Sequence, residues 1–103
     1  MEGRFKIIVE DYDRKGLGKI ISGHTTVMNA RKAAFTEVGK YNNRMVSVYD
    51  SVKRTPLGGF TLIGEVHKWY SGERYWYPSK DGHYASAGKY RLYASGKIGP
   101  RLR

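Results

Sequence analysis

The sequence predicts an α+β fold in which one α-helix packs on a mostly antiparallel β-sheet, with the elements in the order β(β)-α-β-β-β and a twisted hairpin region toward the C-terminus. One stretch carries apolar residues at helical spacing, and several shorter stretches alternate apolar with polar residues. The chain has 103 residues, which is enough for one hydrophobic core. Because a single helix covers only one face of a sheet, we expect the other face to be open to a partner.

The N-terminal segment predicts a strand followed by a shorter returning strand. Residues 4–12 alternate in polarity, and the loop expected at 14–19 is rich in glycine and lysine. Residues 19–22 form the candidate returning strand. The residues expected on one face of the first strand are Phe5, Ile7 and Val9.

Residues 24–43 contain the predicted helix. Apolar residues recur there at steps of three and four and form one stripe: Val27, Ala30, Ala34, Val38 and Tyr41. Thr25 or Thr26 is the expected N-cap, since its side-chain oxygen can accept from a free backbone N–H group. Asn42 and Asn43 suit the left-handed residue that often ends a helix.

The second half of the chain predicts strands and turns. Residues 44–52 are rich in β-branched residues, and the turn expected at 54–59 contains a proline and two glycines. This turn makes residues 44–52 and 60–70 the two arms of a long hairpin. Further strands are expected at 74–78 and 89–94.

The predicted domain covers residues 1–96, and residues 97–103 are expected to form a basic C-terminal tail. The sequence leaves open whether residues 83–88 are strand or loop.

Charge gives the first indication of function. The chain has nineteen Lys and Arg and nine Asp and Glu residues, a net charge of +10. Residues 1–52 hold nine basic and six acidic residues, a balance of +3, whereas residues 53–103 hold ten and three, a balance of +7. Such a field attracts polyanions, among which nucleic acid is the commonest partner.

Aromatic residues concentrate where the positive charge does. Eight of the residues from 69 to 93 are Trp or Tyr. In the strand at 74–78, parity places Tyr75 and Tyr77 on the face opposite Arg74 and Trp76. In the strand at 89–94, the residues that share one face are Lys89, Arg91 and Tyr93.

A sheet face of Tyr and Trp interleaved with Arg and Lys suits single-stranded nucleic acid, because bases stack on rings while cations neutralise phosphates. The candidate binding residues are Trp69, Arg74, Tyr75, Tyr77, Lys80, Lys89, Arg91, Tyr93, Lys97 and Arg101. The competing interpretation is that some of the large rings fill the core instead, with Trp69, Trp76 and Tyr90 as the candidates.

The sequence predicts no enzyme, metal site or cofactor. Its three histidines have no ligand spacing, and the absence of cysteine excludes disulfides and thiolate zinc sites. Residues 15–19 fail the phosphate-loop pattern, because Asp13 stands where glycine is needed and Ile20 where Ser or Thr is needed.

One acidic pair leaves a metal-dependent nuclease as a weaker alternative. Some such enzymes place an Asp on one strand and Glu-x-Lys on the next. Folding the hairpin about residue 57 brings Asp50 near Glu65, and two carboxylates suit Mg²⁺. However, His67 stands at the position of the lysine, and Lys68 falls on the other face.

No signal peptide is visible, since the first residues contain no uninterrupted apolar run. No membrane span is visible either, since no apolar run approaches about 18 residues. We therefore expect a soluble, cytoplasmic protein that does not contact membranes. The oligomeric state stays open.

Two hypotheses follow. The first is a small non-enzymatic nucleic-acid-binding protein that prefers single strands or RNA. The second is a protein-interaction module or inhibitor, such as a viral or mobile-element accessory factor, that binds an acidic or nucleic-acid-handling protein. Both use the same residues, because Tyr, Trp and Arg are also enriched at protein–protein hot spots. The RNA-recognition-motif signature and the helix-turn-helix pattern are absent.

Overall fold

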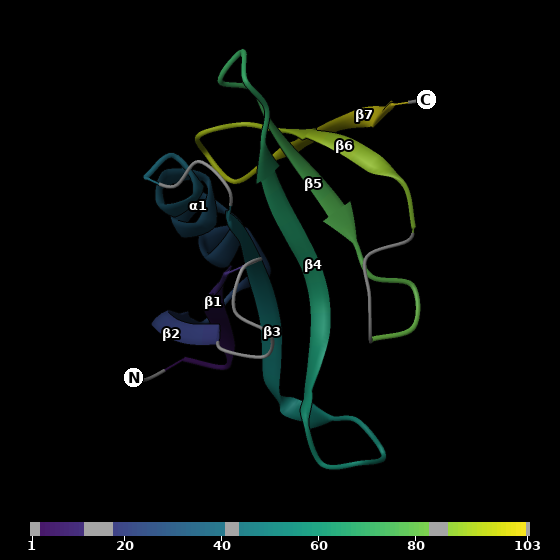
Figure 1. Ribbon diagram of the computed structural model, residues 1–103. Helices are drawn as coiled ribbons and strands as arrows, with labels where there is room; N and C mark the ends of the chain where they lie inside the picture. The colour runs from purple at the N-terminus through teal and green to yellow at the C-terminus, as the bar shows by residue number, and fades with distance from the viewer. Residues whose placement is uncertain (1–2, 12–17, 41–43, 83–86, 103) are drawn as a thin grey trace.

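One α-helix packs on one face of a seven-stranded antiparallel sheet, which confirms the predicted α+β fold (Figure 1). The computed structural model describes residues 3–11, 18–40, 44–82 and 87–102. The elements are β1 (Phe5–Asp11), β2 (Gly18–His24), α1 (Val27–Val38), β3 (Arg44–Arg54), β4 (Phe60–Lys68), β5 (Arg74–Pro78), β6 (Lys89–Leu92) and β7 (Ile98–Leu102). Within these described ranges, no helix is long and apolar enough to cross a membrane.

The strand order in the sheet is β2-β1-β3-β4-β5-β6-β7. Since β2 and β3 both pair antiparallel with β1, they run parallel to each other, and such strands need a long connection. The helix α1 supplies this connection. From β3 onward each strand pairs with its successor, so β3 to β7 form a meander (Figure 1).

The helix begins where the sequence predicts. Thr26 is the N-cap, and its side-chain oxygen accepts from the backbone N–H of Asn29 at 3.1 Å. The helix ends at Val38, with Gly39 as C-cap in a right-handed conformation. The expected end at Asn42 or Asn43, and Tyr41 of the apolar stripe, lie outside the described residues.

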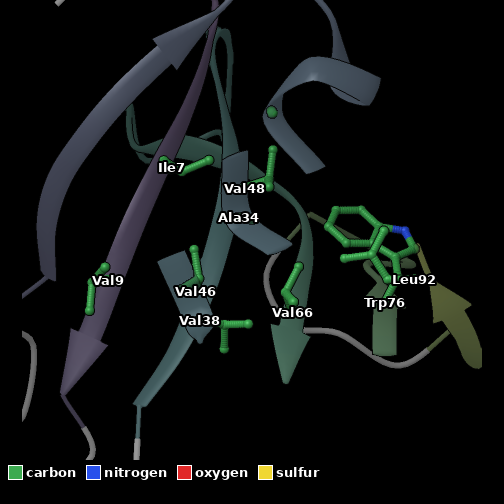
Figure 2. Close-up of a cluster of buried hydrophobic side chains, with 10 residues drawn as sticks. Ile7, Val9, Ala34, Val38, Val46, Val48, Val66, Trp76 and Leu92 are labelled. Carbon is green, nitrogen blue, oxygen red and sulfur yellow. The ribbon is translucent and has the colours of Figure 1, made fainter. Parts of the chain in front are cut away.

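The core lies between α1 and the sheet. Ala30, Ala34 and Val38 from the predicted stripe are buried there. Figure 2 shows that the side chains of the central strands and of Trp76 converge on this layer. The strand residues of the core are Ile7, Val9, Val46, Val48, Val66, Trp76 and Leu92.

Trp76 depends on a glycine beside it. An ideal Cβ atom built on Gly64 would lie 2.4 Å from the Cζ2 atom of the Trp76 ring. The ring therefore occupies the space that a side chain at Gly64 would need. Trp76 is 3% exposed, so the core interpretation holds for this tryptophan.

The β3–β4 hairpin has a different register from the symmetric one expected. Arg54 pairs with Phe60 near the turn, but an irregularity between Arg54 and Asp50 shifts the pairing, so that Asp50 lies opposite Thr61 rather than near Gly64; a second one follows between Tyr49 and Val48. The Asp50 carboxylate accepts from the backbone N–H groups of Val52 and Lys53, at 2.9 and 3.1 Å. These bonds hold the extra residues of the irregular segment on β3.

The C-terminal segment is a strand, not the expected tail. Ile98–Leu102 forms β7, which pairs with β6 after a turn closed by two backbone bonds between Tyr93 and the turn residues. Gly96 fits this turn against the helix, since a Cβ atom there would lie 2.3 Å from the Met28 carbonyl oxygen. Pro100 is tolerated because β7 is an edge strand.

Two other predictions from the sequence concern segments that the structure describes only in part. In the segment at 83–88, only Ala87 and Gly88 are described, and neither is in a strand. In the predicted loop at 14–19, Gly18 and Lys19 belong instead to β2, and the other residues are not described.

Candidate functional site

The strands β4, β5 and β6 have two faces with different side chains. Val66, Trp76 and Tyr90 lie opposite one another across these strands, on the face toward the helix. The neighbouring row, His67, Tyr75 and Arg91, therefore lies on the other face. We call this the open face; its residues are His67, Trp69, Tyr75, Tyr77, Lys89, Arg91 and Tyr93.

Rings and cations alternate on the open face, as the sequence predicts. The ring centroids of Trp69 and Tyr75 lie 5.3 Å apart in an edge-on arrangement. The Lys89 Nζ atom lies 4.5 Å from the Trp69 centroid and 5.0 Å from the Tyr75 centroid. The Arg91 guanidinium lies 5.9 Å from both Tyr75 and Tyr93. These cation–π contacts hold the positive charges among the rings.

Tyr75 is the buried ring of this cluster. It is 8% exposed, and its hydroxyl group donates to a Glu73 carboxylate oxygen at 2.5 Å. This hydrogen bond lowers the pKa of Glu73, and the positive charge of the nearby Arg91 lowers it further. The same bond raises the pKa of Tyr75. Tyr75 is therefore a packing residue of the site, and its ring is not free to stack on a ligand.

Trp69 and Tyr93 are the rings that the open face presents to solvent. They are 47% and 48% exposed; Lys89 contacts the rings of Trp69 and Tyr75, and Arg91 contacts those of Tyr75 and Tyr93. Gly99 of β7 lies beneath Tyr93, since a Cβ atom there would be 3.2 Å from the ring. Two half-exposed rings beside two cations give the site both stacking surfaces and charge.

His67 and Tyr77 extend the open face along β4 and β5. Their ring centroids lie 4.7 Å apart, and His67 Nε2 lies 3.0 Å from a Glu65 carboxylate oxygen. The two carboxylates of this region, Glu65 and Glu73, are thus each held by a neighbour on the same side of the sheet. Sequence reasoning missed Glu73, although its spacing of two from Tyr75 is a signal for a shared strand face.

Arg74 does not belong to the open face. Its guanidinium lies 4.5 Å from the Phe35 ring of α1 and donates to the Gly72 carbonyl oxygen at 2.6 Å. The physical reason is strand parity, because Arg74 alternates with Tyr75 and shares the helix side with Trp76. Its closeness in sequence to the aromatic residues was misleading.

The remaining candidate cations lie around the edges of the sheet. Lys80 is exposed in the turn after β5, and the Gly82 carbonyl oxygen of that turn accepts from the Leu62 amide at 2.9 Å. Lys97 is exposed in the turn between β6 and β7, at the opposite end of these strands. Arg101 lies in β7, where it pairs with Tyr90. The structure therefore does not bring Lys80 together with Lys97.

Asp50, one of the two acidic residues considered as metal ligands in the sequence, forms an ion pair with Arg4. Both of its carboxylate oxygens accept from the Arg4 guanidinium, at 2.8 and 2.7 Å. Glu65 lies opposite Ser47, whereas Asp50 lies opposite Thr61. Within the described part of the chain, no group of three or more His, Asp or Glu residues is placed to hold a metal ion.

The Arg4–Asp50 pair should make stability depend on pH. The hydrogen bond from Arg4, with those from the Lys53 and Val52 amides, lowers the pKa of Asp50 from 3.8 to about 2. The stabilisation is therefore present above pH 4 and is lost as the pH falls toward 2. We expect Asp50→Asn to lower the free energy of unfolding at pH 7, because the ion pair is lost. The loss should be at most about 2 kcal/mol, because Arg4 is half-exposed and water screens its charge.

Urea denaturation of both proteins at pH 7 and near pH 2 measures this effect. The difference between wild type and Asp50→Asn should shrink at low pH. A difference that is equal at both pH values would contradict the ion-pair explanation. Glu37→Gln is the matched control, since its pair with Lys40 lies on the surface and should contribute little.

Comparisons of the chain with protein-family models, with curated proteins and with solved structures found no significant match.

Proposed function

We propose that the protein is a non-enzymatic nucleic-acid-binding protein that holds a single strand of RNA or DNA on its open face. The observation that carries this proposal is the pairing of two half-exposed rings, Trp69 and Tyr93, with the cations Lys89 and Arg91. Bases stacking on such rings contribute about 1–3 kcal/mol each. Phosphates contacted by Lys and Arg add affinity through release of counterions.

Single strands fit this face better than duplex. In a duplex the bases are stacked on one another, and their faces are not available to a protein ring. A single strand can unstack and place its bases on aromatic side chains. The net charge of +10 supports the encounter with a polyanion. The absence of cysteine is consistent with the cytoplasm as the place of this activity.

The proposal predicts how salt and charge affect binding. Fluorescence anisotropy with labelled single-stranded RNA, single-stranded DNA and duplex DNA, between about 50 and 200 mM salt, should show tighter binding to single strands. Arg91→Gln should reduce the slope of log K against log salt by about 0.7, the contribution of one phosphate contact to a single strand.

Lys32→Gln is the matched control, because Lys32 is exposed on the helix and lies away from the open face. It should leave the slope nearly unchanged. Equal affinity for duplex and single strands, or equal slopes for the two variants, would show that the charge acts nonspecifically. The open face would then be assigned to a protein partner, the alternative hypothesis.

A further inference from the structure

The turn of the β3–β4 hairpin is a second surface with unusual exposure. It lies at the lower end of Figure 1, beyond the end of β5. Leu57 at this turn is 96% exposed and Val52 on β3 is 66% exposed. A single exposed leucine is ordinary on a protein surface and by itself indicates no binding site.

The turn holds Leu57 in a defined position. The Thr55 amide donates to the Gly59 carbonyl oxygen at 2.9 Å, and the Gly58 amide donates to the Thr55 carbonyl oxygen at 2.8 Å. The Gly59 amide also donates to the Thr55 hydroxyl at 3.1 Å. Gly58 has φ of 87°, which glycine adopts without strain, and Pro56 fixes its own φ. Presenting the leucine therefore requires little further ordering.

Positive charge surrounds this apolar tip. Lys53 and Arg54 are exposed, and the Arg54 guanidinium lies 4.6 Å from the Phe60 centroid while donating to the Gly58 carbonyl oxygen. Asp50 is the one acidic residue in the sequence from 44 to 64, and Arg4 offsets its charge. The turn after β5 adds no net charge to the base of the hairpin, since it carries both Lys80 and Asp81; its Gly82 carbonyl oxygen accepts from the Leu62 amide at 2.9 Å.

We propose that this hairpin tip binds the end of a nucleic-acid duplex, so that the preferred ligand is a junction between duplex and single strand. Pro56 and Leu57 would pack against the terminal base pair, while Lys53 and Arg54 neutralise the flanking phosphates. Leu and Pro are among the side chains that proteins insert against base steps. The surrounding cations favour this polyanion over an uncharged protein pocket. The proposal rests on the single-strand binding proposed above.

The strand β4 connects the two contacts and sets their separation. The strand has nine residues with a rise of about 3.4 Å each, which places Phe60 about 27 Å from Lys68. Lys68 directly precedes Trp69 in the sequence. At an axial rise of about 3.4 Å per nucleotide, this distance corresponds to roughly eight nucleotides of a strand whose bases stay stacked between the two contacts. Affinity should therefore increase with the length of the single-stranded overhang up to about this number.

Leu57→Ala tests the hairpin contact directly. We expect about a tenfold loss of affinity for a duplex with a single-stranded overhang of about eight nucleotides, since the leucine loses its buried apolar contact. Affinity for the matched single strand should be unchanged. Fluorescence of 2-aminopurine in the terminal base pair should change when wild-type protein binds, because the environment of the base changes, and change less with Leu57→Ala. Ile20→Ala, an exposed apolar residue on edge strand β2, is the matched control.

The outcomes separate this proposal from the one that it deepens. Unchanged affinity of Leu57→Ala for the junction overturns the hairpin contact, while single-strand binding stands. Loss of sedimentation with phosphatidylserine vesicles in Leu57→Ala, with junction binding intact, assigns the tip to lipid and also overturns it. If wild-type protein fails to bind single strands, the function proposed for the open face fails. In that case, blunt duplex is the test ligand. If Leu57→Ala loses binding to blunt duplex, the proposed hairpin contact stands; if Leu57→Ala still binds blunt duplex as wild type does, the proposed contact is overturned.

Discussion

Replacing Trp76 by alanine should lower the free energy of unfolding by about 3–5 kcal/mol, the cost typical of removing a large ring from a core. Trp76 is 3% exposed, and its ring fills the space above Gly64. The Arg31 guanidinium lies 5.5 Å from the ring and is itself anchored to the Gly96 carbonyl oxygen. The cavity left by alanine would therefore loosen the contact between α1 and the C-terminal strands. Urea denaturation followed by circular dichroism measures the change.

Gly64→Ala provides the control for this prediction. Alone, it should cost about 1–3 kcal/mol, because the added methyl group meets the Trp76 ring. In the Trp76→Ala background the same substitution should cost much less, because the ring is no longer there. Additive costs in the double variant would mean that the close approach of Gly64 and Trp76 does not determine the packing here.

Replacing Trp69 by alanine should weaken binding to single-stranded nucleic acid by about tenfold or more, because one stacking contact of about 1–3 kcal/mol is lost. Trp69→Phe should retain most of the affinity, since phenylalanine keeps a ring on which a base can stack. Trp69 is 47% exposed, so both variants should fold. Anisotropy titrations measure affinity, and urea midpoints show whether the fold is intact.

Tyr93 extends this test to distinguish nucleic acid from a protein partner. Stacking should tolerate Tyr93→Phe and be weakened by Tyr93→Ala. A hydrogen-bonded protein interface would be weakened by both. Tyr75 is unsuitable for the comparison, because its hydroxyl bonds to Glu73 and its ring is buried, so its replacement would disturb the fold itself. Equal binding by wild type and Trp69→Ala would remove stacking at this position from the proposal.

Local periodicity was sufficient to predict the fold class and much of the open face. The helical stripe gave Ala30, Ala34 and Val38, whose burial the structure confirms. Alternation along the strands placed Lys89 and Arg91 on one face, and the structure surrounds them with aromatic rings. These features depend only on residues a few positions apart, and such spacings are visible in a sequence.

Features that depend on distant residues could not be predicted. The register of the β3–β4 hairpin is shifted where Asp50 bonds to the amides that follow it, and the carboxylate is fixed by Arg4, 46 residues away. The strand β7 was missed because Gly99 and Pro100 disfavour strands, whereas its pairing with β6 decides its structure. Arg74 was counted among the candidate binding residues for its nearness in sequence, although strand parity had already placed it opposite Tyr75 and Tyr77, where the structure has it.

The strand order described above also has a consequence for how the chain folds. From β3 to β7, each strand pairs with the next strand in the sequence, so these contacts close short loops and form at a low entropic cost. The pairing of β1 with β3 instead joins residues such as Phe5 and Asp50 across β2 and the helix. We therefore expect the meander that carries the open face to assemble first, and the N-terminal strands to dock onto it in the slower step.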